Sequence, residues 1–502
     1  MVQQYLSERE NELTTLTASR LAERIRSREA TAVEVTTAFC HRAAIAQQLV
    51  NCLTEIFFQD GLDQAKELDR ILEATGKPVG PLHGVPVSLK DHYNVKGYPT
   101  TAGYCSYAKL PVKENDAHIV KIMRDAGAVV YCKTNNPQCM MVLETVSNIY
   151  GRTLNPRNTL LGAGGSSGGE GALLAMHGSP LGIGSDIGGS IRVPAAFNGL
   201  YGFKPSGKRV PTGGWECTMM GNDPITAVAG PLGHSVEDLE LFFQIVSDAE
   251  PWLQEPVLEI PWRKENHGLG EKLTIGVMYW DEVVMPHPYI TRVLSEAVEK
   301  LKAAGHEVIE FKPYDHKRAW DDILLPIYFA DGGLDIKNTL AESGEPMLAC
   351  AKRLIDDPLV KMREVHEIWR LHMARDIYRT EYLAHWAATA SESASGKPID
   401  VILCPASNVQ GTPHDIKPWW GYCSQWNLLD YPSSVIPAGN VVQDDKYPAN
   451  YVPVNALDQE NFELYNPELY RGLPVALQIV AKTMQDEKVM EATRRIDAVL
   501  NP

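Results

Sequence analysis

The sequence lacks the features that mark membrane-spanning, secreted and nucleic-acid-binding chains. It has no window of about 18 consecutive apolar residues, and its polar start, MVQQYLSERE, contains no signal-peptide core. The net charge is −16 and no basic run offsets it, which argues against a nucleic-acid partner. The nine cysteines are scattered without a C-x-x-C pair, as is typical of reduced thiols. We therefore expect a cytoplasmic protein without a transmembrane segment.

The apolar residues that are present follow a helix–glycine–strand rhythm. Residues 117–126 predict a helix that ends at Gly127, and residues 128–131 predict a buried strand. The same signals recur at 274–279 and 290–304. This rhythm is typical of a sheet covered by helices on both faces, so we predict an α/β fold with a central mixed, twisted sheet.

One large domain is expected over residues 1–502. Its core spans about 80–240, and a mostly helical insertion is expected at about 315–395. Residues 400–500 then rejoin the sheet, beginning with the apolar strand at 401–405. A chain of this length buries roughly three quarters of its unfolded surface and needs no disulfide staple.

Two glycine-flanked serine clusters make residues 162–206 the candidate site. The first cluster is GGSSGG at 164–169, and the second is GGS at 188–190. Because glycine costs backbone entropy, such density is expected where the main chain approaches another group closely or needs positive φ. The apolar run at 172–176 argues against a flexible linker and places backbone N–H groups at a helix start, which suits an oxyanion.

Other glycine motifs fit this stretch less well. A P-loop is excluded because Glu170 and Gly171 stand where Lys and Ser or Thr must follow, and a Rossmann motif lacks its third glycine at Ile187. The G-x-S-x-G elbow of α/β-hydrolases fits around Ser166, but it requires a strand directly before that serine, where the sequence indicates a loop. It also requires a downstream histidine, and the candidates have no distinguishing context: His234, His267, His306 and His414.

The glycine–serine stretch, joined with residues 85–91 upstream and KTNNPQ at 133–138, resembles the amidase signature family of serine hydrolases. The similarity is greatest to the branch that holds fatty acid amide hydrolase and the fungal acetamidase-type enzymes. It covers most of the chain and includes further matching segments: 51–56, 151–156, 228–233 and 428–432.

The resemblance implies a Ser–cis-Ser–Lys triad. Lys90 matches the base, Ser166 the bridging serine that follows a cis peptide, and Ser190 the nucleophile. The resemblance also implies an oxyanion hole from four backbone N–H groups, those of Ile187, Gly188, Gly189 and Ser190. Met140 and Ser166 are expected to contact the substrate, and no metal or cofactor is implied.

The chemistry of such a triad can be stated from the residues themselves. A hydroxyl becomes a nucleophile when a base takes its proton, and a neutral amine can do so without a histidine. Lysine has an ordinary pKa near 10.4, so work near neutrality needs its ammonium form destabilised by roughly 4 kcal/mol. Burial has the required sign. Without the resemblance, a lone lysine at a strand end, such as Lys90, is interpreted as a solvated surface charge.

Several neighbours are interpreted as supporting residues. Ser167 is either a hydrogen-bond donor to the site or structural, and Asp186 and Arg192 are expected to make structural hydrogen bonds. Asn136 and Asn198 depart from residues frequent in the family, which leaves substrate choice open. An aromatic cluster either walls a pocket or packs a loop; it consists of Trp419, Trp420, Tyr422 and Trp426.

We predict an amidohydrolase that forms an acyl-enzyme on Ser190 and cleaves small or medium aliphatic or aryl primary amides. The alternative is an amidotransferase that works with partner chains, which the acidic composition disfavours. A silent scaffold is disfavoured because all three triad positions are present. The family resemblance further suggests a homodimer.

Overall fold

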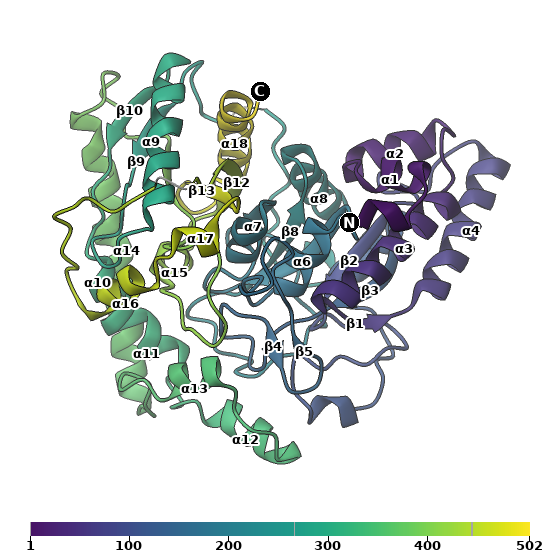
Figure 1. The fold of residues 1–502 in the computed structure, drawn as a ribbon, viewed down its shortest axis with the longest axis horizontal. Helices are drawn as coiled ribbons and strands as arrows, with labels where there is room; N and C mark the ends of the chain where they lie inside the picture. The colour runs from purple at the N-terminus through teal and green to yellow at the C-terminus, as the bar shows by residue number, and fades with distance from the viewer. Residues whose placement is uncertain (1, 266, 443–444) are drawn as a thin grey trace.

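An eleven-stranded mixed sheet runs through the molecule (Figure 1). The computed structural model describes residues 2–265, 267–442 and 445–502. Across the sheet the strands follow the order β1 (Leu53–Ile56), β3 (Val129–Thr134), β2 (Pro86–Lys90), β6 (Leu181–Asp186), β8 (Val228–Gly233), β7 (Tyr201–Lys204), β12 (Ser433–Asn440), β13 (Pro474–Val480), β11 (Val401–Pro405), β9 (Thr274–Val277) and β10 (Glu307–Glu310). A separate antiparallel pair is formed by β4 (Val146–Ser147) and β5 (Gly151–Arg152).

The sheet is parallel in two places and antiparallel elsewhere. Strand β2 pairs in parallel with β3 and β6, and β9 pairs in parallel with β10 and β11. Strand β12 connects the two halves because it pairs with β7 on one side and with β13 on the other. The C-terminal strands therefore complete a sheet that the N-terminal half begins, and the predicted mixed sheet is confirmed.

Helices cover both faces of this sheet. They are α1 (Glu8–Thr14), α2 (Ala18–Arg26), α3 (Ala32–Val50), α4 (Phe58–Thr75), α5 (His118–Asp125), α6 (Gly168–Ala175), α7 (Arg192–Asn198), α8 (Val236–Asp248), α9 (Pro288–Ala303), α10 (His316–Arg318), α11 (Leu325–Tyr328), α12 (Leu334–Ser343), α13 (Ala349–Ile355), α14 (Val365–Ala388), α15 (Gly421–Leu428), α16 (Ala456–Leu464), α17 (Pro467–Tyr470) and α18 (Asp486–Leu500).

Two strand glycines show which helix lies on which face. Gly182 of β6 faces the side chain of Glu170 on α6, whereas Gly233 of β8 faces Asp238 on α8. Helix α6 contacts α3 and α7 on its face, and α8 contacts α5 and α18 on the other. Helices α10 to α14 lie between β10 and β11 in sequence and gather at one end of the molecule (Figure 1).

The long helix α14 shows how spacing sets its inner face. Tyr378, Tyr382 and Trp386 recur every four residues and are fully buried. Ile368 and Leu371, nearer the start of the same helix, are only half-buried. None of the described helices combines the length and the apolar character needed to span a bilayer.

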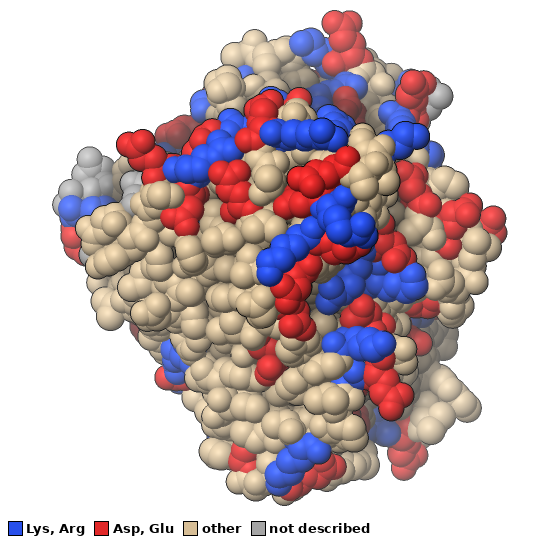
Figure 2. Space-filling view, turned by 90° about the vertical axis from the view of Figure 1, so that its right-hand side faces the viewer, with Lys and Arg blue, Asp and Glu red and all other residues tan. Residues whose placement is uncertain are grey.

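The face formed by the N-terminal helices carries charges of both signs side by side (Figure 2). On α1 and α2, Arg9 and Arg24 both pair with Glu12, and Arg20 pairs with Glu23. Since each cation has an acidic neighbour, this face offers little uncompensated positive charge to a phosphate backbone.

The backbone of α6 closely approaches the residue that follows β3, and this contact allows a test of the packing. A Cβ at Gly169 would lie 2.3 Å from the backbone nitrogen of Asn135, whereas a Cβ at Gly162 would meet only ordinary contacts at 3.5 Å or more. We expect Gly169→Ala to destabilise the fold by about 1–3 kcal/mol through overpacking. Thermal unfolding of both alanine variants measures this, with Gly162→Ala as the matched control. Equal melting temperatures for the two variants would contradict the packing described.

Candidate active site

The ends of two parallel strands bring the site together. Strands β2 and β6 pair in parallel, with Ser88 opposite Gly182, so Lys90 at the end of β2 lies at the same sheet edge as Ser185 and Asp186. Clefts outside the carboxyl ends of strands are where open α/β sheets bind ligands. All five residues of β2 are buried, so Lys90 points into protein and not into solvent.

Lys90 makes two short polar contacts inside the protein. Its Nζ lies 2.6 Å from Ser166 Oγ and 2.9 Å from Ser185 Oγ, and the side chain is 0% exposed. Burial lowers the pKa of Lys90 to about 7, although the negative charge of Asp186 acts in the opposite direction. A substantial fraction of this amine is therefore uncharged near neutral pH, as a general base requires.

Glu170 on α6 is a further buried group beside Lys90. It accepts hydrogen bonds from Ser88 Oγ at 2.6 Å and Thr134 Oγ1 at 2.8 Å. Burial raises the pKa of Glu170 to about 8, even though these hydrogen bonds and Lys90 act to lower it. Because the carboxyl group is mostly protonated at neutral pH, it adds little of the negative charge that would return Lys90 to its ammonium form.

The first serine cluster packs tightly against the chain before β4. The peptide bond between Gly165 and Ser166 is cis, and a Cβ at Gly165 would lie 2.7 Å from backbone atoms of Val142 and Glu144. Glycine is therefore required at this position by the available space. The next residue, Ser167, donates its backbone N–H to Ser190 O at 3.1 Å, which places the two serine clusters side by side.

The second serine cluster wraps around the carboxylate of Asp186. The N–H of Gly189 donates to Asp186 Oδ1 at 2.9 Å, and the N–H of Ile191 donates to Oδ2 at 3.0 Å. One of the four expected oxyanion donors is thus engaged by a side chain. Within the described chain, the N–H groups of Ile187, Gly188 and Ser190 make no hydrogen bond. Gly189 has φ +124°, a conformation that favours glycine.

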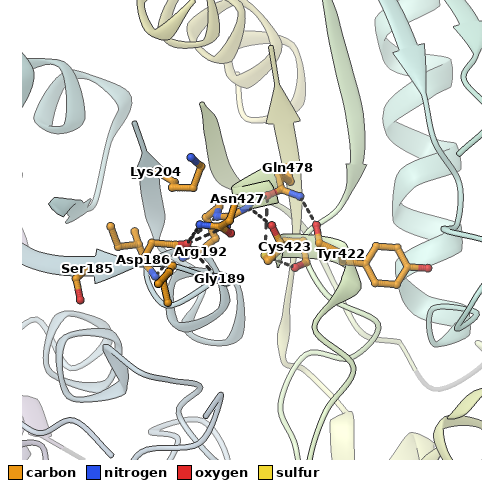
Figure 3. A network of polar contacts seen from close by, with 12 residues as sticks. Ser185, Asp186, Gly189, Arg192, Lys204, Tyr422, Cys423, Asn427 and Gln478 are labelled. Atoms are coloured by element: carbon orange, nitrogen blue, oxygen red, sulfur yellow. Dashed lines mark hydrogen bonds and ion pairs between the residues drawn. The ribbon is translucent and has the colours of Figure 1, made fainter. Parts of the chain in front are cut away.

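Asp186 and Arg192 form a buried network behind the nucleophile loop (Figure 3). Arg192 binds the carboxylate in a bidentate manner, with Nη2 at 2.9 Å and Nε at 3.1 Å, and both side chains are 0% exposed. Its remaining donors contact Asn427 Oδ1 at 2.6 Å and Gln478 Oε1 at 2.9 Å. Burial would raise the pKa of Asp186, but the Arg192 guanidinium holds it well below its ordinary value. Both members of the pair are therefore charged, and together they position the loop.

A cavity of about 500 Å³ opens over these groups. Lys90, Ser166 and Ser190 all line it, and so does Met140, the residue expected to contact substrate. A volume of this size accommodates a small organic ligand. A larger groove of about 1110 Å³ adjoins the cavity, and the two share Tyr328 and most of the segment 217–223.

The alternative based on the G-x-S-x-G elbow is wrong. Residues 163–167 form no strand, so Ser166 does not stand at a strand-to-helix turn. None of the four histidines considered for that elbow lines the cavity; His92 is the histidine that does. Hydrolysis by a serine–histidine pair centred on Ser166 is therefore not supported by the geometry.

The remaining sequence candidates lie outside the cavity wall. Asn136 and Asn198 are buried elsewhere, and Asn198 Nδ2 donates to the carbonyl of Ala163 at 2.8 Å. The aromatic cluster packs the core: Trp420 lies against Gly188, and Tyr422 donates to Val284 O at 2.7 Å. Of the two interpretations for that cluster, packing fits the structure, but Tyr422 and Trp426 lie on α15 and not in the expected loop.

Three polar residues near the triad positions were not identified from the sequence: Ser185, Glu170 and His92. Ser185 contacts Lys90 only because β2 and β6 are neighbours, and sequence spacing carries no signal for that pairing. Tyr328, from the distant helix α11, donates to Ile187 O at 2.5 Å. The sequence contained one signal that could have identified His92, namely its position two residues after Lys90.

One group of side chains outside the cavity has the donor types of a metal site. Ligand atoms of Glu144, Cys350 and Asp415 lie within 4.8 Å of one another. Arg152, however, pairs with both Glu144 and Asp415, so both carboxylates already have a cationic partner from the protein. Cys350 Sγ donates to Glu144 at 2.9 Å, and burial raises the pKa of that thiol. This chemistry is that of a satisfied ion-pair cluster.

Comparison with known proteins gives the same assignment as the motifs. The chain matches the Amidase family model over residues 34–490. It is 45% identical to an amidase of Gibberella zeae and 42% identical to an acetamidase of Emericella nidulans, with 99% of this chain and 91% of each relative covered.

A solved structure of a fatty acid amide hydrolase superposes with a TM-score of 0.93 at 36% identity, covering 100% of this chain and 88% of that one. The resemblance seen in the sequence is thus confirmed, as is the predicted fold. The chain belongs to the amidase family and is a hydrolase that acts on amides.

Proposed function

We propose that the protein hydrolyses carboxylic amides through an acyl-enzyme on Ser190, with Ser166 and Lys90 completing a Ser–cis-Ser–Lys triad. The observation that carries this proposal is the 2.6 Å contact between Lys90 Nζ and Ser166 Oγ, made without exposure to solvent beside a cavity that Ser190 also lines. A neutral amine in that position can accept a proton through a hydroxyl, which makes a serine nucleophilic.

The proton follows a relay of three side chains. As Ser190 Oγ attacks the amide carbon, its proton passes to Ser166 Oγ while the Ser166 proton passes to Lys90 Nζ. When the tetrahedral intermediate collapses, the C–N bond breaks, and the proton held by Lys90 returns through Ser166 to the departing nitrogen. Water then attacks the acyl-enzyme by the same route and releases the carboxylate, which restores Ser190.

The oxyanion is assigned to backbone donors. The N–H groups of Ile187, Gly188 and Ser190 have no partner within the described chain, so they are available to the oxygen that gains charge. Each such donor typically stabilises the transition state by about 2.7–4 kcal/mol. The network of Asp186 and Arg192 holds the loop that carries them.

The substrates are small or medium aliphatic or aryl primary amides, which yield ammonia. A cavity of about 500 Å³ has room for such molecules, and one relative at 42% identity is named an acetamidase. Nothing in the structure favours the amidotransferase alternative. The homodimer and the cytoplasmic location stay predictions.

Removal of the nucleophile tests the central assignment. Ser190→Ala lacks the hydroxyl that forms the acyl-enzyme, so primary-amide turnover by the purified chain falls by about 10⁴-fold or more. Ammonia release without added glutamine, tRNA or partner chains measures it. Ser179→Ala is the matched control, because Ser179 Oγ donates to Leu181 O and the residue lies outside the cavity wall. Amide turnover that survives in Ser190→Ala would refute the nucleophile.

The proposed base predicts the direction in which kcat/KM changes with pH. Only the uncharged amine accepts a proton, and burial lowers the pKa of Lys90 to about 7. We therefore expect kcat/KM for a primary amide to rise with pH through about 7 and to level off above it. Lys90→Ala removes this limb and lowers amide turnover by about 10²–10⁴-fold. Esters lose less, since an alkoxide leaves with less need of a proton.

The exposed Lys96 supplies the control for this profile. Lys96→Ala keeps the limb because its amine lies in solvent. An acid limb that persists unchanged in Lys90→Ala would show that another group titrates, and the neutral-amine base would be abandoned.

A further inference from the structure

His92 differs from the other deeply buried histidines of the chain. His83, His287 and His316 each hydrogen-bond at least one ring nitrogen to a protein atom. Both ring nitrogens of His92 lack a partner among the described residues, although the residue is only 2% exposed. A buried polar group without a partner costs free energy, so a partner from outside the chain is expected for this ring.

The ring is held firmly at the wall of the active-site cavity. Its centroid lies 4.3 Å from that of Tyr93 and 5.1 Å from that of Trp215, which also lines the cavity. The backbone carbonyl of His92 accepts from the N–H of Glu216 at 2.8 Å. Packing on two aromatic rings restricts the imidazole before any ligand arrives.

The imidazole is uncharged. Burial lowers the pKa of His92 well below its ordinary value, and the positive charges of Lys90 and Lys133 lower it further. A neutral imidazole has one N–H donor and one bare nitrogen that accepts a hydrogen bond. It therefore offers the cavity an acceptor that does not titrate in the range where Lys90 changes charge.

His92 lines the same cavity as Lys90 and Ser166 and follows Lys90 by two residues. The positive charge of the Lys90 amine acts on its ring. In the proposed reaction Lys90 and Ser166 return the proton to the departing nitrogen, so that nitrogen must lie near them. An acceptor close to that nitrogen meets N–H groups that a departing amine carries and a departing alcohol lacks.

We propose that the bare ring nitrogen of His92 accepts a hydrogen bond from the amide N–H of the substrate and so favours amides over esters of the same acyl group. This role rests on the proposed function and makes His92 a specificity-determining contact. The same contact binds an amine that attacks the acyl-enzyme in the reverse direction, because that amine enters where the leaving group departs.

The test uses His92→Phe, whose flat ring retains the contacts with Tyr93 and Trp215, and compares a primary amide with a methyl ester of the same acyl group. The ratio of kcat/KM for amide over ester falls about tenfold in His92→Phe, and His92→Asn, which keeps an acceptor, recovers part of it. His234→Phe is the control: His234 is also stacked on a ring, that of His177, but lies outside the cavity wall.

Acyl transfer to hydroxylamine gives a second readout that a purely structural role would not move. The bond from the acyl carbon to Ser190 Oγ breaks, a bond to the hydroxylamine nitrogen forms, and the proton lost by that nitrogen passes through Ser166 to Ser190. From the ester, the ratio of hydroxamate to carboxylate falls several-fold in His92→Phe. The pH limb near 7 and the rate at which a fluorophosphonate labels Ser190 stay as in the unaltered chain.

Two results would overturn the proposal. Equal losses for amide and ester, together with slower labelling, would show that His92 only supports packing; unchanged ratios would show that the substrate does not engage it. Measurements on the unaltered chain show whether the proposed function itself fails. In that case the unaltered chain would not turn over amides, and any labelling by the fluorophosphonate would persist in Ser190→Ala.

Discussion

The amine of Lys90 is kept out of water, and the proposed chemistry of the site depends on this desolvation. Burial at the end of β2 lowers its pKa to about 7, whereas a solvated lysine would be charged at every physiological pH and could accept no proton. The surroundings are consistent with that demand. The neighbouring carboxyl of Glu170 is itself mostly protonated at neutral pH, so it does not supply a full counter-charge that would restore the ammonium.

The buried charge pair behind the loop that carries Ser190 has a different task. Asp186 and Arg192 are fully buried and satisfy each other, and the carboxylate also binds the N–H groups of Gly189 and Ile191. Replacing a buried ion pair by apolar groups is often neutral for stability, so its presence is weak evidence for a stabilising role. Its contacts reach α15 and β13 through Asn427 and Gln478, which ties the nucleophile loop to the far half of the sheet. Positioning of that loop is what the network achieves.

Polar groups are distributed unevenly around the cavity. Ile187 and Ser190 line one part of it, and Lys90, Ser166 and His92 are further polar residues around it. In the proposed reaction the backbone donors bind the developing oxyanion, whereas Lys90, Ser166 and His92 interact with the departing nitrogen. The larger adjoining groove shares most of the segment 217–223 with the cavity, so this loop borders both of them.

The sequence by itself determined the fold class and the family, and it supplied the three residues that are proposed as the triad. These depend on local signals: glycine spacing at 164–169 and 188–190, helix–glycine–strand periodicity, and the short motif around Lys90. What only the tertiary structure decided are contacts between distant segments. The pairing of β2 with β6 brings Ser185 to Lys90, and the approach of Asp186 to Gly189 removes one expected oxyanion donor. The unpartnered nitrogens of His92 likewise follow from packing. Periodicity shows which face of an element is apolar, but hydrogen bonds between segments depend on strand order and close packing, which no local pattern encodes.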